Sequence, residues 1–486
     1  MTGFGIHWFR RDLRLKGNPA LLANLDRHRG RVLGLFIIDP VILSRGDFSV
    51  NRFGFLLETL VVLSEQMKAA GGELLVLDGG PENGFKLVLS LLKKKFRLPE
   101  SCSWNRDYEP FAIARDLRVE QLLRTQFGTH VTIRRDHLLI EPEELSKPSG
   151  KDRTYRIYTP FARRWFELFR SGEVRARIRE QGGSELPQFA LTWKNVLSAD
   201  RLPLGRLDYY RKKFTPQLNV VLPPAGYIAA KQRLLQFKDH ALQEYADDRD
   251  LPAKDGTSRM SVYLKNGSIS ISQIIGELGL VNCRFQENNG RSRFLKELVW
   301  REFYYHILFH FPRVEQKAFN PKFEKLKWAK SDSHFQAWTE GRTGYPIVDA
   351  GMRQLRQEGW MHNRVRMIVA SFLTKDLLIS WQRGEEYFMK NLLDGDLASN
   401  NGGWQWAAST GCDPQPYFRI FNPKLQGERF DPEGEYVKRY IPELRNADRR
   451  WIHEPGDRCP ANYPAPIVNH AYQKTRALIF YDKQFS

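Results

Sequence analysis

Phe4-Gly5-Ile6-His7-Trp8-Phe9 opens the chain as a short apolar run, and the charged segment Arg10-Arg11-Asp12-Leu13-Arg14-Leu15 follows it directly. Comparable short runs recur at Val32 to Ile38, Leu74 to Leu77 and His130 to Ile133. Between them, Phe53 to Ala70 and Arg115 to Gln126 carry apolar residues at helical spacing. Strands that alternate with helices are typical of a doubly wound parallel sheet, so we expect an α/β domain at the N-terminus.

The rest of the chain has a different pattern. Between about residues 140 and 210, prolines interrupt the sequence and leave one expected helix near Phe161 to Arg170. Beyond Pro216 strand patterns nearly vanish and helical spacing takes over, as in Ser292 to Phe311, Ile347 to Leu355 and Arg364 to Ser380. We therefore expect an α/β domain over residues 1–135, a long connector over 136–215 and a larger all-helical domain over 216–486.

Charge and composition narrow the classes of function. The chain has 75 Lys and Arg against 56 Asp and Glu, a net charge of +19, which favours nucleic acid as the partner. Its 4 cysteines are far apart with no Cys-x-x-Cys pair, so neither a metal site nor a disulfide framework is expected. No apolar run approaches the roughly 18 residues of a membrane span. We expect a cytoplasmic monomer with no membrane association and no obligatory protein partner.

Acids, amides and indoles crowd into one window, Asp394-Gly395-Asp396-Leu397-Ala398-Ser399-Asn400-Asn401-Gly402-Gly403-Trp404-Gln405-Trp406. Acids accept hydrogen bonds from a ligand's N–H and hydroxyl groups, an amide can face a nitrogen that changes protonation on reduction, and indoles stack or pass electrons. The glycines let the backbone come close. The window therefore suits a planar, redox-active ligand, although an amide-rich cap before a helix with core tryptophans is the alternative for any single residue.

A second candidate site is the segment Gly256-Thr257-Ser258-Arg259-Met260-Ser261, which comes shortly after Tyr245 and Arg249. Hydroxyl and backbone N–H groups at a helix start, beside a glycine and an arginine, can form a nest for phosphate oxygens. Simple helix capping by Thr257 and Ser258 is the alternative.

These segments resemble the photolyase/cryptochrome family, and most closely the class I bacterial photolyases that repair cyclobutane pyrimidine dimers. The resemblance also rests on Trp300-Arg301-Glu302-Phe303-Tyr304, on Gly344-Tyr345-Pro346-Ile347-Val348-Asp349-Ala350-Gly351-Met352-Arg353 and on Met361-His362-Asn363-Arg364-Val365-Arg366-Met367. It covers nearly the whole chain. It implies a lyase that uses blue light to split the dimer in DNA, in a bacterial cytoplasm and associated with the nucleoid. A cryptochrome-type light receptor and a (6-4) photoproduct photolyase are the alternatives.

The resemblance implies that the helical domain binds FAD. The contacts it transfers to this chain are Tyr245, Thr257, Ser258, Arg259, Met260, Ser261, Arg366, Asp394, Gly395, Asp396 and Asn400. Among these, Asn400 matches the asparagine that faces flavin N5, and Arg366 is expected to pair with Asp394. The resemblance also implies an antenna chromophore, methenyltetrahydrofolate or a deazaflavin, without deciding between them.

The resemblance further implies a route for electrons and a lesion site. Trp404, Trp381 and Trp328 match the family's electron-transfer chain from the flavin to the surface. Catalytic roles fall on Glu297, Asn363, Met367 and Asn400. Contacts to DNA fall on Arg249, Glu297, Trp300, Arg301, Tyr304, Asn363, Arg364, Val365, Trp406, Arg419 and Gln426. The chain departs from the family at Lys16-Gly17-Asn18, where an acid is usual, and at Val262, where proline is common.

Overall fold

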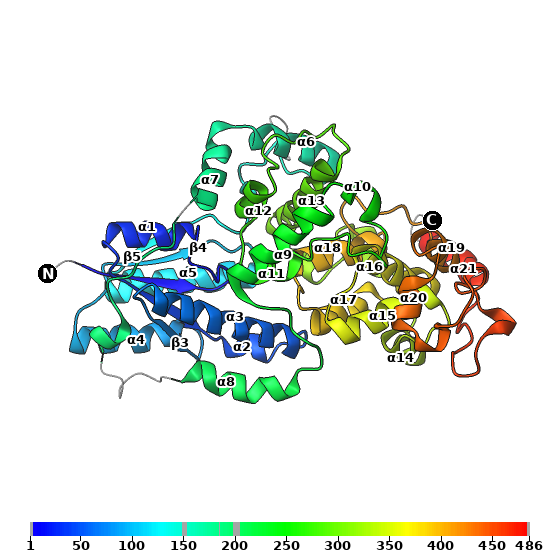
Figure 1. Ribbon diagram of the computed structural model, residues 1–486, viewed down its shortest axis with the longest axis horizontal. Helices are drawn as coiled ribbons and strands as arrows, with labels where there is room; N and C mark the ends of the chain where they lie inside the picture. Colours follow the sequence, from blue (N-terminus) through cyan, green and yellow to red (C-terminus); the bar gives the residue numbers. More distant parts are fainter. Residues whose placement is uncertain (1–2, 148–152, 184, 198–204, 484–486) are drawn as a thin grey trace.

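The computed structural model describes residues 3–147, 153–183, 185–197 and 205–483. In this part of the chain a parallel sheet has the strand order β3-β2-β1-β4-β5 (Figure 1). Its strands are β1 (Gly5–Phe9), β2 (Val32–Ile37), β3 (Leu74–Leu77), β4 (Ser101–Asn105) and β5 (His130–Arg134). The order reverses beside β1, which pairs with both β2 and β4, so the carboxyl ends of these strands meet at a switch point. The α/β fold class is confirmed.

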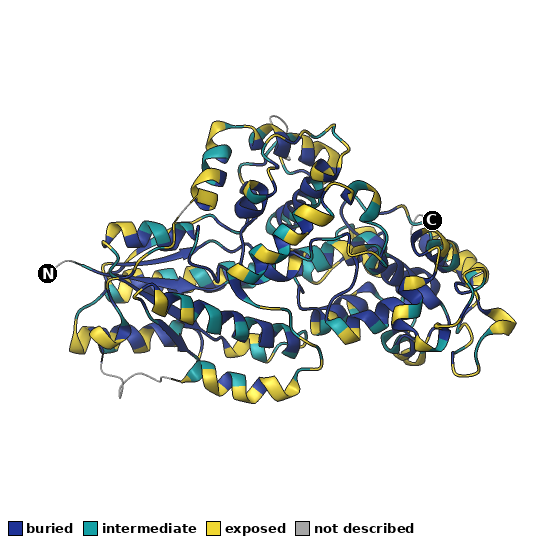
Figure 2. Cartoon of the chain, in the orientation of Figure 1, coloured by how far each residue is buried: buried dark blue, intermediate teal, exposed yellow. Residues whose placement is uncertain are grey.

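Helices cover both faces of the sheet, which explains why strands β1, β2 and β3 are mostly apolar. These helices are α1 (Pro19–Arg27), α2 (Pro40–Leu43), α3 (Val50–Ala69), α4 (Pro81–Lys95) and α5 (Pro110–Phe127). Side chains of α4 and α5 pack with Ile6 and Trp8 on one face. Those of α1 and α3 pack with Phe9 and Val32 on the other. Figure 2 shows the inner strands buried and the outer sides of the helices exposed, and β1 to β4 are buried along their whole length.

The sequence pattern missed strand β4. Its residues alternate between serine and larger side chains, and serines usually indicate a loop. Here Ser101 and Ser103 are both buried. The ring of His28, the residue after α1, lies 2.8 Å from Ser101 Oγ, and Asn24 of α1 donates to Ser103 Oγ at 2.9 Å. Satisfied hydroxyl groups are compatible with a central strand.

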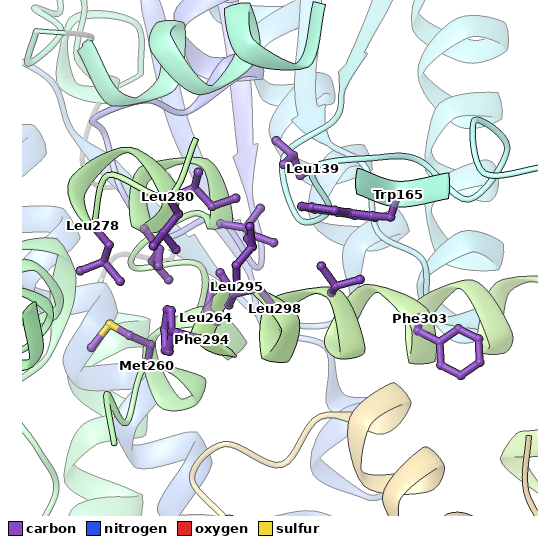
Figure 3. Close-up of a cluster of buried hydrophobic side chains, with 14 of the residues drawn as sticks. Leu139, Trp165, Met260, Leu264, Leu278, Leu280, Phe294, Leu295, Leu298 and Phe303 are labelled. Atoms are coloured by element: carbon purple, nitrogen blue, oxygen red, sulfur yellow. The ribbon is translucent and has the colours of Figure 1, made fainter. Parts of the chain in front are cut away.

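The segment expected to be a connector with one helix contains three helices among its described residues. They are α6 (Tyr158–Phe169), which matches the expected helix, α7 (Gly172–Gly183) and α8 (Arg206–Phe214). Figure 3 shows Trp165 of α6 and Leu139 beside Leu295, Leu298 and Phe303, in one buried apolar cluster. The first two of these helices therefore add to the core of the helical part rather than only linking two domains.

The rest of the described chain is helical, as expected. Its helices are α9 (Gly226–His240), α10 (Tyr245–Asp248), α11 (Ser261–Asn266), α12 (Ile271–Glu277), α13 (Gly290–His310), α14 (Asp332–Glu340), α15 (Pro346–Glu358), α16 (Asn363–Ser371), α17 (Trp381–Asn391), α18 (Leu397–Ala407), α19 (Pro423–Phe430), α20 (Glu435–Tyr440) and α21 (His470–Asp482). The single helix expected over Arg364 to Ser380 is wrong: α16 passes into a π-helical turn over Phe372–Asp376 and then stops. Leu378 has a φ of 53°, which a helix cannot continue through.

The loop after β1 touches the end of α11, and this contact joins the α/β part to the helical part. Leu13 N donates to Asn266 O at 3.1 Å, and Arg14 donates to Gly267 O at 3.1 Å. Gly267 has a φ of 72°, and a Cβ atom there would lie 1.9 Å from Arg11 O. Only glycine permits this close approach. No helix in the described residues is both long and apolar enough to cross a membrane.

Candidate functional site

Three helices turn one face each toward a cavity of about 510 Å³ in the helical part. Most lining residues of each helix follow the i, i+3, i+4, i+7 spacing that places side chains on one face. From α13 these are Glu297, Trp300, Arg301 and Tyr304; from α16 they are Asn363, Arg366, Met367 and Ala370; from the N-cap and body of α18 they are Asp396, Ser399, Asn400 and Gly403. The cavity is thus defined by helix periodicity.

Most of the residues proposed from sequence line this one cavity. The remaining proposed residues at its wall are Tyr245, Arg249, Thr257, Ser258, Arg259, Met260, Ser261, Asp394, Trp404 and Trp406. They come from segments up to 161 positions apart, between Tyr245 and Trp406. Asp394 and Trp404 are buried, whereas Asn363 is exposed, so the cavity extends from the interior to solvent.

Some proposed residues lie outside the cavity wall. These are Gly395, Arg364, Val365, Arg419, Gln426, Trp381 and Trp328. The expected DNA contact by Val365 is wrong for its side chain, because Val365 is 0% exposed and packs in the core around α15 and α16. Gly395 is buried and faces Arg52 of α3, so the expected cofactor contact is not made through the cavity wall. Arg419 is exposed and Gln426 is half-buried on α19.

Asp394 forms the centre of an acidic part of the wall. Arg366 donates to Asp394 Oδ2 at 2.9 Å, so the expected pairing of these two residues is present. Ser261 Oγ donates to the same oxygen at 2.6 Å. Two donors therefore satisfy one oxygen of this buried carboxylate.

The loop before α11 does not cap that helix with its hydroxyl groups. Met260 is the N-cap residue and makes no side-chain cap, while Ser258 Oγ accepts from Met260 N at 3.2 Å. Arg233 holds the loop from behind by donating to Thr257 O at 2.7 Å and to Ser258 O at 3.2 Å. Because Arg233 occupies these two carbonyl groups, the backbone N–H and hydroxyl groups of the loop are the ones left to contact a ligand.

Glu385 of α17 lies directly behind Asn400. Asn400 Nδ2 donates to Glu385 O at 3.1 Å, and Asn401 Nδ2 donates to Glu385 Oε1 at 3.0 Å. Burial raises the pKa of Glu385 to about 8 against the effect of the Asn401 hydrogen bond, and the charges of Asp47 and Glu315 raise it further. Sequence reasoning missed this residue, and its only signal is the position one helix turn after Trp381.

The outer part of the cavity carries an ion pair and a stacked aromatic pair. Arg249 Nη1 donates to Glu297 Oε1 at 2.5 Å. The indole of Trp300 stacks on Tyr158 of α6, with ring centroids 3.5 Å apart and an interplanar angle of 3°. Asn363 Nδ2 lies 4.0 Å from Met367 Sδ. These groups offer one charged and several flat or polarizable contacts.

Two of the three proposed electron-transfer tryptophans, Trp404 and Trp381, are buried, and the third, Trp328, is half-buried. Trp404 lines the cavity, Trp381 is 2% exposed in the same apolar cluster, and Trp328 is half-buried at its edge. Ala329 N donates to Leu378 O at 2.8 Å, which ties the segment after Trp328 to the loop before Trp381. Residues distant in sequence are thereby brought to one side of the cavity.

The comparisons with known proteins agree along the chain. Residues 5–180 match the family model described as DNA photolyase, and residues 294–483 match that described as FAD binding domain of DNA photolyase. The chain is 41% identical to a deoxyribodipyrimidine photo-lyase of Agrobacterium fabrum (98% of this chain and 97% of the relative) and 37% identical to that of Escherichia coli K12 (98% of each).

Solved structures give the same picture. A bacterial class III photolyase from Agrobacterium tumefaciens is 37% identical with a TM-score of 0.81, covering 100% of this chain and 98% of that one. An archaeal photolyase from Sulfolobus tokodaii with two FAD molecules is 29% identical with a TM-score of 0.78, covering 99% of each chain. A Synechocystis cryptochrome is 26% identical with a TM-score of 0.82, covering 98% of this chain and 99% of that one.

Proposed function

The chain belongs to the DNA photolyase family and carries its FAD-binding domain, and from this premise we propose that it is an enzyme that splits cyclobutane pyrimidine dimers in DNA under blue light. The observation that carries the proposal is the single cavity that gathers Asp394, Asn400 and Trp404 with Glu297 and Trp300. The class I assignment stays a prediction, because the structures that the chain resembles include a class III enzyme.

We propose that FAD binds at the buried part of this cavity. The donor set suits it: the loop of Thr257 to Ser261 can meet phosphate oxygens, Asp394 can accept from ligand hydroxyl or N–H groups, and Asn400 can meet a flavin nitrogen. When bound and reduced, FAD supplies on light absorption the electron that opens the cyclobutane ring and that returns afterwards. The chain's own residues bind, orient and shield the two reacting partners from water.

The lesion would enter the outer part of the cavity. Glu297 can hydrogen-bond a pyrimidine, and Trp300 and Trp406 offer apolar surfaces to a nucleotide that is flipped out of the DNA helix. Flipping costs less free energy for a damaged base pair, because its pairing and stacking are already weakened. Because Arg249 is paired with Glu297, a pyrimidine must compete with or replace that ion pair. No histidine among the described residues lines the cavity, which supports cyclobutane dimers over the (6-4) photoproduct.

We propose that a second cavity holds the antenna chromophore. It measures about 230 Å³ and lies at the carboxyl edge of the sheet, against α3, α11 and α17. Its wall combines aromatic rings such as Trp8, Phe36 and Phe111 with the cations Arg45 and Arg115. The same wall also carries acids such as Asp47 and Glu109, so it suits a flat pigment with polar substituents, and methenyltetrahydrofolate and a deazaflavin both meet that description.

The partner proposed is DNA, bound by a monomer without other proteins in the bacterial cytoplasm, where it would associate with the nucleoid. The net charge of +19 supports contacts to phosphates, which weaken as salt is added. Arg419 and Gln426 are available for such contacts, since both reach solvent. The division into residues 1–135, 136–215 and 216–486 also stays a proposal.

The deciding experiment measures the loss of one thymine cyclobutane dimer from a DNA strand by the purified flavoprotein with its flavin chemically reduced, in the dark and under blue light. We expect loss of the dimer only under light. The matched variant Glu297→Gln keeps the shape of the side chain and removes its charge, and we expect FAD to be retained with a lower repair yield. If FAD binds and can be photoreduced but no dimer is lost, the receptor function or the other photoproduct replaces the proposal.

A further inference from the structure

Arg11, in the loop after β1, reaches out of the α/β part to Asp396, which lines the FAD-binding cavity. Its guanidinium donates to Asp396 Oδ2 at 2.8 Å, to Tyr305 OH at 2.8 Å and to Glu109 Oε1 at 2.6 Å. Its Nε also donates to Lys265 O at 3.2 Å. Arg11 is therefore bonded to α11, to α13 and to the residue that starts α18.

Asp396 is the point where this network meets the cavity. It lines the cavity, and as N-cap of α18 it accepts from Ser399 N at 3.1 Å through Oδ1. Its other oxygen, Oδ2, accepts from Arg11 and from Tyr305 OH, with Lys265 Nζ at 3.8 Å. Burial opposes ionisation, but Lys265, Arg11 and Arg301 outweigh it and hold the pKa of Asp396 well below its usual range.

The network is balanced in charge. Its cations are Arg11, Lys265 and Arg301, and its acids are Asp107, Glu109 and Asp396. Burial and the charges of Arg301 and Arg11 lower the pKa of His137 well below its usual value, so its ring stays neutral. Removing one member of this balanced, partly buried set leaves an opposite charge without its partner, which is costly.

From these contacts we infer that Arg11 is a positioning residue for Asp396, so that the docking of the α/β part fixes the start of α18 and the flavin site. The inference rests on the proposed binding of FAD in this cavity. Arg11 belongs to the α/β part and does not line the cavity, so the inference gives it an indirect role in the flavin site.

Arg10 provides a matched control. It is the neighbouring arginine of the same loop, and it is 9% exposed. Its guanidinium contacts Asp116 and Asn105 O and lies 4.6 Å from the ring of Trp8, all within the α/β part. Replacing Arg10 therefore disturbs the same loop without removing a contact to Asp396.

The test compares Arg11→Met, Arg10→Met, Asp396→Asn and the double variant Arg11→Met/Asp396→Asn. Each is measured for the FAD dissociation constant by flavin fluorescence and for the midpoint potential of the bound flavin. We expect Arg11→Met to weaken FAD binding by about tenfold or more, as for loss of one partner of a buried charged pair. We also expect a more negative potential, because loss of the cation disfavours the added electrons.

The double variant separates positioning from a general loss of structure. If Arg11 acts through Asp396, removing Arg11 in the Asp396→Asn background should weaken binding by clearly less than it does alone. Arg10→Met should leave FAD affinity within about twofold of the parent. An effect of Arg11→Met that is equally large in the Asp396→Asn background, or equalled by Arg10→Met, would overturn the inference. A parent protein that binds no FAD would instead reject the proposed function.

Discussion

At the scale of single residues, the site places ionisable groups where solvent is absent and controls their charge by their partners. Asp394 accepts hydrogen bonds from Arg366 and Ser261. Glu385 has no cation and keeps its proton. Asp394 lines the cavity beside Arg366, whereas Glu385 lies behind Asn400 and outside the cavity wall, so the two acids have different surroundings.

Glu385 gives a pH dependence with a defined sign. Its pKa is about 8 in the folded protein and about 4.5 in the unfolded chain, so between these values the folded state holds a proton that the unfolded state has lost. Stability therefore falls as pH rises through this window, by up to about 1.4 kcal/mol per pH unit from this group.

Glu385→Gln should remove this contribution. We expect its free energy of unfolding, relative to the parent, to improve steadily between pH 5 and pH 8 in denaturant titrations. Glu386→Gln is the control, because Glu386 is an exposed neighbour on α17 that pairs with Lys390. A parallel pH profile for Glu385→Gln and the parent would show that Glu385 is ionised throughout.

At the scale of elements, α17 and α18 pack so closely that a glycine is required between them. A Cβ atom on Gly384 of α17 would lie 2.2 Å from the indole of Trp404 on α18. Because Trp404 also lines the cavity, the distance between these helices sets the position of one cavity wall.

Gly384→Ala should therefore destabilise the protein by about 1–3 kcal/mol through overpacking. It should also shift the absorption of bound flavin, since Trp404 must move. Gly182→Ala is the matched control: Gly182 lies in α7 with nothing near its Cβ position, and alanine there should stabilise by about 0.5–1 kcal/mol. Thermal unfolding of both variants makes the comparison, and equal melting temperatures would refute the packing argument.

The elements also show how far sequence patterns reach. Apolar runs predicted four of the strands and α13, because burial repeats at the period of the element. Strand β4 was missed because its serines are satisfied by partners from α1 and the residue after it, and the break after α16 was missed because Leu378 adopts a left-handed backbone. Strand β4 and the break after α16 depend on tertiary contacts, which the spacing of apolar residues along the sequence does not encode.

The site was predicted unevenly for the same reason. Asp394, Asn400 and Trp404 carry chemistry in their residue types, whereas Val365 shares a motif with site residues but points into the core. Arg11 stands in a quoted motif, yet its partner Asp396 is 385 positions away, which no local pattern reveals.

At the scale of the whole molecule, the cavity is lined by segments between Tyr245 and Trp406, and the α/β part contacts it through the hydrogen bond from Arg11 to Asp396. The matched family segments end at residue 180 and resume at residue 294, and the phosphate-type loop of Thr257 to Ser261 lies between them. From the cavity, Trp404, Trp381 and Trp328 lead toward the surface.

Trp328→Phe should impair photoreduction of the oxidised flavin while sparing repair by enzyme reduced beforehand, because only the first process needs an electron from outside the cavity. Flavin absorbance under blue light with an added reductant measures photoreduction, and dimer loss measures repair. Trp451→Phe is the control, a half-buried tryptophan packed on the same apolar cluster. Loss of both activities in Trp328→Phe would refute the separate route.

The stack of Trp300 on Tyr158 limits how a ligand can bind to the indole. One face of the indole is already covered at 3.5 Å, so only the opposite face can accept another flat ring. The tyrosine is itself fastened, since its hydroxyl donates to Lys296 O at 3.1 Å and its backbone N donates to Asp413 at 3.0 Å. The indole of Trp300 is therefore already fixed in the folded protein. Binding of a flat ligand then costs less side-chain conformational entropy than it would with a mobile side chain.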